Sequence, residues 1–219
     1  LSVQIGIDYP NKIDRQEIIF NYLKQEGIKF FNNSIIENMV ERTNGFSGAD
    51  IKEYVYMIKL YLEENKIECL TFEGVFDVFL DMVLGSKKDL LMTQKELMEV
   101  AFHEVCHGFL QYILYKNNKS MNDFSFITIE PRENILGVSF SIGDDYYKSY
   151  KKEYLESDLK IALAGKCGQD IFLQSVDAGA VSDLEYATKI AYLYVDKFGM
   201  GSRLAVKNKI FRYEFEQSD

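Results

Sequence analysis

The sequence predicts a mainly α-helical protein with one small β-sheet. Most of the chain carries apolar residues at three- and four-residue spacing, which is typical of helices with one buried face. Alternation of apolar and polar residues is confined to short segments, which favours few strands. With 47% hydrophobic and 27% charged residues, the chain has the composition of a folded protein with a sizeable core.

The first part of the chain is expected to be a helical module. Residues 3–7 alternate like a short strand, and the periodicity then predicts helices at residues 14–25, 33–43, 47–65 and 71–84. Ser47 is the expected N-cap of the third helix, because Asp50 stands at its third helical position. The polar segment 85–89 is the best boundary, so we expect two domains, 1–85 and 86–219.

The second part is expected to combine helices with a hairpin. A long helix is predicted at 93–115, where Thr93 and Glu96 resemble a capping box. Residues 124–130 and 136–142 read as two strands that turn at Pro131 and form a hairpin. Helical periodicity returns at 158–173 and 183–198, and we interpret these apolar stripes as core.

Both histidines of the chain lie in one window, His103-Glu104-Val105-Cys106-His107. In a helix, residues four apart share a face, so both imidazoles can bind one metal ion, and zinc fits best. Glu104 is not needed as a ligand and can accept a proton from water at the fourth coordination position, as a general base. The simpler alternative is one packed and one solvated histidine of an ordinary helix.

The third ligand of such a site must be a carboxylate or a thiol, because there is no third histidine. Ile113 occupies the position where a metzincin has its third histidine. A carboxylate ligand roughly twenty residues after the motif, as in thermolysin-like enzymes, has poor candidates, because Asp123 lies in a loop and Glu130 at a strand end. Cys106 would compete for space between the imidazoles and is better explained as a packed thiol. Asp183 is more attractive, although a helix-start carboxylate that interacts with the helix dipole is the simpler local explanation.

Charge and cysteine content limit the partners and the compartment. A net charge of −9 and a pI near 4.9 argue against a nucleic-acid surface, which needs clustered Lys and Arg. Cys69, Cys106 and Cys167 are irregularly spaced and indicate reduced thiols of an intracellular protein. No apolar run is long enough to span a bilayer, so we expect the chain to be soluble as given. Its start at Leu1 suggests a fragment or a processed chain.

Several motifs together resemble those of the FtsH-type AAA zinc metalloproteases over nearly the whole chain. Gly45 to Ile51 is similar to the Gly-Phe-Ser-Gly-Ala-Asp signature of the helical lid of FtsH ATPase modules. Further motifs follow in the family's order, at residues 92–93, 103–107, 128–132, 136–138, 163–166, 179–184, 187–188 and 198–200. The resemblance implies a helical AAA lid subdomain at 1–85 and a helical zincin-type FtsH peptidase domain at 86–219.

The resemblance also implies roles for particular residues. By residue match, His103, His107 and Asp183 would bind one zinc ion per chain, and Glu104 would be the catalytic base, which overturns the local interpretation of Asp183. The substrate strand at the cleft would comprise Leu136, Gly137 and Val138. At the start of the lid helix, Gly48 and Ala49 would contact nucleotide.

At the level of the parent protein, the resemblance implies a ring-shaped homo-hexamer that degrades unfolded and membrane proteins and uses ATP. Nothing in this chain matches the G-x-x-x-x-G-K-[ST] loop, so ATP and Mg²⁺ would act only through an ATPase portion missing from this sequence. The membrane would be reached through a missing N-terminal segment, with this part on the cytoplasmic or organelle-interior side.

Two alternatives stay open, and departures from the family pattern support the first of them. Val105 and Cys106 replace a usual alanine and glycine and are expected to crowd the helix. The usual Gly-Arg-Ala-Ala-Glu-Glu appears as Gly-Lys-Cys-Gly-Gln-Asp at 165–170, which loses a carboxylate at Gln169 and adds a helix-weakening Gly168. One alternative is therefore a catalytically weak or inactive FtsH paralogue with a structural or regulatory role. The other is an unrelated zincin that follows an all-helical binding domain.

Overall fold

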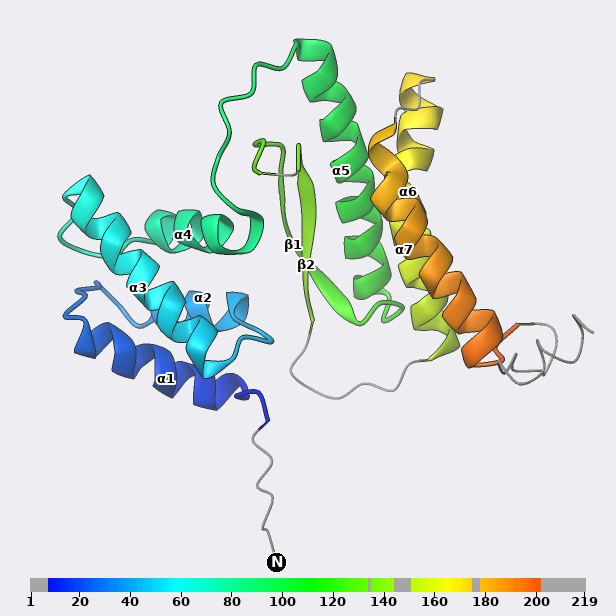
Figure 1. Ribbon diagram of the computed structural model, residues 1–219. Helices are drawn as coiled ribbons and strands as arrows, with labels where there is room; N and C mark the ends of the chain where they lie inside the picture. The colour runs from blue at the N-terminus through cyan, green and yellow to red at the C-terminus, as the bar shows by residue number, and fades with distance from the viewer. Residues whose placement is uncertain (1–7, 134, 144–150, 175–177, 202–219) are drawn as a thin grey trace, which may run out of the picture. The chain divides into compact units, whose positions relative to one another are not determined.

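A computed structural model describes residues 8–133, 135–143, 151–174 and 178–201 (Figure 1). The chain is mostly helical with a two-stranded antiparallel sheet, which confirms the predicted fold class. The strand predicted at residues 3–7 lies outside the described residues. Internal contacts divide the chain into two compact units: unit 1 comprises 1–90, 130–136 and 142–147, and unit 2 comprises 91–129, 137–141 and 148–219.

Unit 1 is built from four helices, α1 (Lys12–Gln25), α2 (Ser34–Arg42), α3 (Gly48–Asn65) and α4 (Phe72–Leu84). Helix α1 packs on α2 and α3, and α4 packs on the same two helices (Figure 1). Their inward faces supply a core of fully buried apolar side chains, among them Ile19, Leu23, Met39, Ile51, Val55, Ile58, Val75 and Phe79. Ser47 and Asp50 form a capping box at the start of α3, which confirms the predicted N-cap.

The segment between the two strands also belongs to unit 1, and Arg132 fixes it there. The Arg132 side chain is fully buried. Its Nη1 donates to Asp81 Oδ1 over 2.5 Å and to the Gly85 carbonyl oxygen over 2.9 Å. These acceptors lie at the C-terminal end of α4, where backbone carbonyls have no helical partner. The guanidinium therefore joins the hairpin segment to the end of α4.

Unit 2 contains the long helix α5 (Gln94–Lys116), β1 (Asn122–Thr128), most of β2 (Val138–Gly143), α6 (Lys152–Leu173) and α7 (Val181–Tyr192). A 3₁₀ turn, Ala178–Ala180, precedes α7, and a π-helical turn, Leu193–Lys197, follows it. Helix α5 packs against both β1 and α6, and α7 packs along α6 (Figure 1). This packing places α6 and α7 beside the helix that carries both histidines.

Two helices of unit 2 differ from the predicted boundaries. Helix α6 begins at Lys152, six residues before the predicted start at 158, because the buried Leu155 and Ser157 extend its inner face through a charged stretch. The helix predicted at 183–198 changes to π-helical geometry at Leu193, where the Tyr194 hydroxyl donates to Glu156 Oε1 over 2.7 Å. Across the described ranges, no helix combines the length and the apolar character required to cross a membrane.

Candidate metal centre

His103 and His107 project from the same face of α5, one turn apart. Their Nε2 atoms are 3.0 Å from each other. The helix begins as predicted, since Thr93 and Glu96 form a capping box, and it continues through the motif because residues 94–116 contain no proline. The spacing of four residues therefore brings the two imidazoles together, as expected from helical geometry.

Asp183 completes the cluster from α7. Its Oδ2 lies 2.9 Å from His103 Nε2 and 3.2 Å from His107 Nε2. The residue occupies the first turn of α7, where a carboxylate is favoured by the helix dipole, so its local role and its place in the cluster are compatible. Burial raises the pKa of Asp183, but hydrogen bonds with the two histidines outweigh it and hold that pKa well below its usual range.

The remaining nitrogen of each imidazole is held by α6. His107 Nδ1 lies 2.6 Å from the Ile161 carbonyl oxygen, and His103 Nδ1 lies 3.4 Å from Gln169 Oε1. Both partners are acceptors, so each Nδ1 donates to α6, and with a metal ion bound each Nε2 would serve as its ligand. Gln169 is itself oriented, because its Nε2 donates to the Glu99 carbonyl oxygen over 3.3 Å.

This donor set fits a tetrahedral zinc ion. An ion about 2.0–2.1 Å from each of three tetrahedral ligands would place those atoms about 3.3 Å apart. The three atoms here are 2.9–3.2 Å apart, which is close to that spacing. Two imidazoles and one carboxylate also leave the fourth position open, as catalytic zinc sites require.

The close approach of α6 depends on glycine. A Cβ built on Gly165 would lie only 2.6 Å from His103 Nε2 and would overlap His107 Nε2. A Cβ built on Gly168 would overlap the Cys106 sulfur. Helix α6 therefore presents its smallest residues to the face of α5 that carries the histidines, which keeps the orienting groups of α6 within hydrogen-bonding distance.

Glu104 is half-buried beside the histidines. Burial raises the pKa of its carboxyl group, opposed by the charges of His103 and His107. The Ser139 backbone N–H donates a hydrogen bond to the carboxylate. A Cβ built on Gly137 would lie 3.0 Å from Glu104 Cγ, so Gly137, which directly precedes β2, lies alongside the predicted base.

The structure brings together His103, His107 and Asp183, with Glu104 beside the histidines and Gly137 beside Glu104. Other carboxylate and thiol alternatives do not join the cluster: Glu130 pairs with Lys87 and Arg132, and the Cys106 sulfur packs at Gly168. Burial raises the pKa of the Cys106 thiol, as suits a packed side chain. Val105 is half exposed, so the expected crowding does not arise there.

Sequence reasoning did not identify the groups that orient the histidines. In the sequence, Gln169 stands out only because it replaces a carboxylate of the family pattern. Ile161 contributes a backbone oxygen, which no side-chain pattern reveals. Gly168 was interpreted as a weakness of the helix. The relevant signal was the pair of glycines, Gly165 and Gly168, on one side of an otherwise regular helix, a pattern typical of close helix packing.

A helical unit that presents H-E-x-x-H and a distant aspartate to one point has the architecture of a zinc-peptidase domain. The model of peptidase family M41 matches residues 90–214, more than half of the chain, and the chain therefore belongs to that family.

Similar proteins include the ATP-dependent zinc metalloproteases FtsH of three bacteria. That of Thermobaculum terrenum is 26% identical over 203 residues, covering 93% of this chain and 30% of the relative. That of Marinobacter nauticus is 29% identical, with 92% and 31% covered, and that of Mesomycoplasma conjunctivae is 30% identical, with 92% and 26% covered. The chain thus spans about a third or less of the length of these relatives.

Proposed function

We propose that this chain is part of an ATP-dependent zinc endopeptidase, with residues 1–85 as the helical lid of an AAA module and 86–219 as the peptidase domain. The observation that carries the proposal is the convergence of His103 Nε2, His107 Nε2 and Asp183 Oδ2 within 3.2 Å. Membership of peptidase family M41 and similarity to the FtsH relatives support it.

In this proposal His103, His107 and Asp183 hold one zinc ion. When bound, zinc polarises the scissile carbonyl and lowers the pKa of water in the open position. Glu104 accepts a proton from the attacking water and returns it to the leaving amine. Its raised pKa suits both steps, since a base that must also act as an acid works best when its pKa approaches the working pH.

The proposed substrate strand is Leu136, Gly137 and Val138. Within the described residues the sheet has the order β1-β2, so β2 has an outer edge to which an extended peptide can add as a further strand. Contact between Gly137 and Glu104 would bring such a peptide past the base. Main-chain pairing explains how unfolded or membrane proteins of varied sequence could serve as substrates.

A test compares zinc-loaded wild type with Glu104→Gln. We expect the variant to keep zinc, because Glu104 is not a ligand, and to hydrolyse an unfolded fluorogenic polypeptide about 10²–10⁴-fold more slowly. Glu185→Gln is a matched control, since Glu185 is exposed on α7. Equal rates for Glu104→Gln and wild type would refute the assigned base. Zinc binding without hydrolysis by the wild type would favour the inactive structural or regulatory paralogue, an alternative motivated by Gln169.

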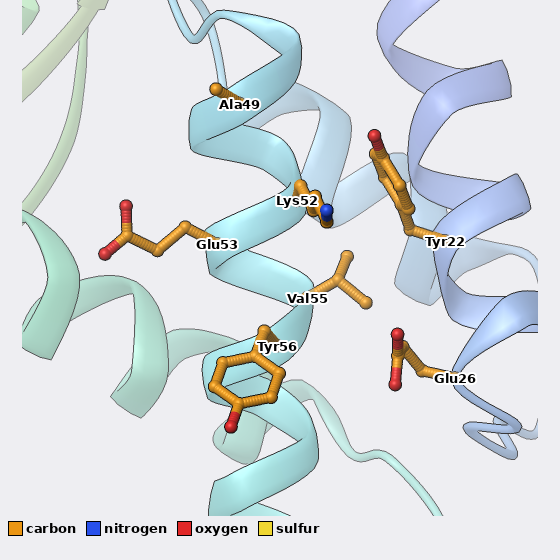
Figure 2. Close-up of a pocket in the computed structure, with 7 residues that line it drawn as sticks. All are labelled: Tyr22, Glu26, Ala49, Lys52, Glu53, Val55 and Tyr56. Atoms are coloured by element: carbon orange, nitrogen blue, oxygen red, sulfur yellow. The ribbon is translucent and has the colours of Figure 1, made fainter.

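In unit 1, we propose that Gly48 and Ala49 contact nucleotide bound to the rest of an AAA module. They begin α3, and the exposed N–H groups of a helix start favour phosphate. Ala49 lines a hollow of about 310 Å³ together with Tyr22 and Glu26, from the end of α1, and Lys52, Glu53, Val55 and Tyr56 of α3 (Figure 2). An Mg-ADP titration followed by the backbone amide NMR signals of Gly48 and Ala49 tests this, and unmoved signals would contradict it.

The remaining features of the parent protein are proposals from the family resemblance, and only ATP dependence and zinc are also stated in the names of the relatives. Assembly as a homo-hexamer, use of ATP and Mg²⁺ and attachment to a membrane would all involve parts of the protein outside this sequence. The name of each relative states ATP dependence and zinc for that relative. Mass measurement of the longer parent protein by light scattering would test the hexamer directly.

A further inference from the structure

Cys106 and Gly168 meet where α5 and α6 approach each other beside the metal ligands. Cys106 lies between His103 and His107 in the sequence, and Gly168 directly precedes Gln169. The Cys106 side chain lies where a side chain at position 168 would otherwise stand, because a Cβ built on Gly168 would overlap Sγ and come within 2.9 Å of the Cys106 Cβ. If position 106 carries a side chain, position 168 must therefore be glycine, and the reverse also holds.

The spacing of these helices determines the orientation of both imidazoles. Gln169 Oε1 accepts from His103 Nδ1 and the Ile161 carbonyl accepts from His107 Nδ1, and both acceptors belong to α6. A side chain at 168 would push α6 away from α5. The His103 contact, already 3.4 Å, would then exceed hydrogen-bonding distance.

We propose that Cys106 and Gly168 are a matched pair of positioning residues for the zinc ligands. The thiol fills the space that the glycine leaves, and the pair fixes α6 at the distance where Gln169 and Ile161 hold the two histidines. Relative to the family pattern described above, the larger residue has moved to α5 and the smaller to α6, so each departure compensates the other. The inference rests on the proposed zinc site.

The test is a series of variants of the full 219-residue chain, with zinc affinity measured by competition with a chromogenic chelator. Gly168→Ala should weaken zinc binding about tenfold or more, the range found when groups that orient metal ligands are lost. C106A/G168A should recover only part of the affinity, because the two Cβ atoms would still be 2.9 Å apart. C106G/G168A removes the overlap and should restore affinity close to that of the wild type.

Two controls separate this pair from general effects of alanine. Gly201→Ala should leave zinc affinity unchanged, because among the described residues a Cβ there meets Val195 alone, at an ordinary 3.7 Å. Gly165→Ala should also weaken zinc binding, but adding Cys106→Gly should not restore it, because the added methyl group would contact His103 and His107 directly. The cobalt-substituted protein gives a second readout, since its visible absorption bands report ligand geometry.

The outcomes distinguish failure of the matched-pair proposal from failure of the proposed zinc site. If folded Gly168→Ala binds zinc like the wild type, or if Cys106→Gly fails to rescue it, the pair is refuted. Circular dichroism shows whether Gly168→Ala is folded. If it is unfolded, recovery of both the fold and the zinc affinity in C106G/G168A supports the matched pair, and failure to recover either one overturns the proposal. If the wild type binds no zinc, the proposed function fails, and thermal stabilities of the same variants decide whether the two positions are coupled.

Discussion

Gln169 holds His103 with a neutral amide whose two ends have different partners. Its oxygen faces the imidazole and its nitrogen faces the Glu99 carbonyl, so only a residue with both an acceptor and a donor satisfies the site. We expect Gln169→Leu to raise the zinc dissociation constant about 10–100-fold. Gln169→Glu should fall between leucine and wild type, since it keeps the acceptor and loses the donor.

Chelator competition measures these affinities, and Gln94→Leu is the control, because Gln94 is an exposed residue at the start of α5, the helix that carries His103. An unchanged zinc dissociation constant in Gln169→Leu would show that the Gln169 amide does not orient His103. A loss in Gln94→Leu as large as that in Gln169→Leu would point instead to a general effect of added leucine.

Asp158, on α6, is a half-buried carboxylate whose pKa is raised by burial. A raised folded-state pKa means that the charged form is destabilising at neutral pH, and the penalty disappears once the pH falls below the unfolded-state value, about 3.9. We therefore expect Asp158→Asn to melt at a higher temperature than wild type at pH 7, with the difference closing as the pH falls. Thermal melts across this range, with the exposed Asp170→Asn as control, measure the effect. A difference independent of pH would contradict it.

Residues of the site differ in how far the sequence could predict them. His103, Glu104 and His107 lie within one helical turn, so their proximity follows from local geometry. Asp183 lies 76 residues beyond His107, and local reasoning favoured a helix-start role for it; only the family resemblance indicated a ligand. Gln169 could not be predicted, since its role depends on how α6 packs against α5.

At the scale of elements, local signals predicted helix starts well. Ser47 with Asp50 and Thr93 with Glu96 form capping boxes as predicted, because capping involves residues only three apart. The start of α6 was placed too late because charged residues interrupt its apolar pattern. The π-helical turn after α7 was not predicted, and its contact from Tyr194 to Glu156 spans 38 residues.

The end of α4 depends on an ion pair that can be tested. Arg132 is fully buried, so loss of Asp81 leaves a buried cation with weaker compensation. We expect Asp81→Ala to destabilise the protein by about 2 kcal/mol, less than the roughly 3–5 kcal/mol of a fully broken buried pair. Asp81 is partly exposed, and Arg132 keeps the Gly85 carbonyl and the Glu130 carboxylate as partners. Urea unfolding measures the change. The exposed Asp89→Ala is the control, and equal stability of the two variants would contradict the expected role of the pair.

At the scale of the whole molecule, zinc should stabilise unit 2, because it would connect the ligands of α5 with Asp183 of α7, and α6 orients both histidines. At a free zinc concentration a hundredfold above the dissociation constant, binding contributes about 2.7 kcal/mol. For a chain of this size that corresponds to a rise in melting temperature of roughly 5–10 °C. Calorimetry with and without a chelator measures the shift, and His103→Ala should abolish it. A chelator effect that persists in His103→Ala would place the metal elsewhere.

A boundary near residue 85 was predictable as a hypothesis, because the change from regular helices to a polar segment is visible in the sequence. The membership of residues 130–136 in unit 1 was not, since it depends on a buried arginine that meets acceptors about 50 residues earlier in the chain.

That arginine affects how the protein can be recombined with its relatives. In a chimaera joined near residue 90, Asp81 would come from one parent and Arg132 from the other, even though the two form an ion pair in which the arginine is fully buried. Such hybrids should express poorly unless both parents carry compatible residues at these two positions, and transplanting the segment 130–136 together with the N-terminal portion should rescue them. The residues that stabilise unit 1 therefore lie on both sides of residue 90 in the sequence, so a single junction there cannot exchange the unit as a whole.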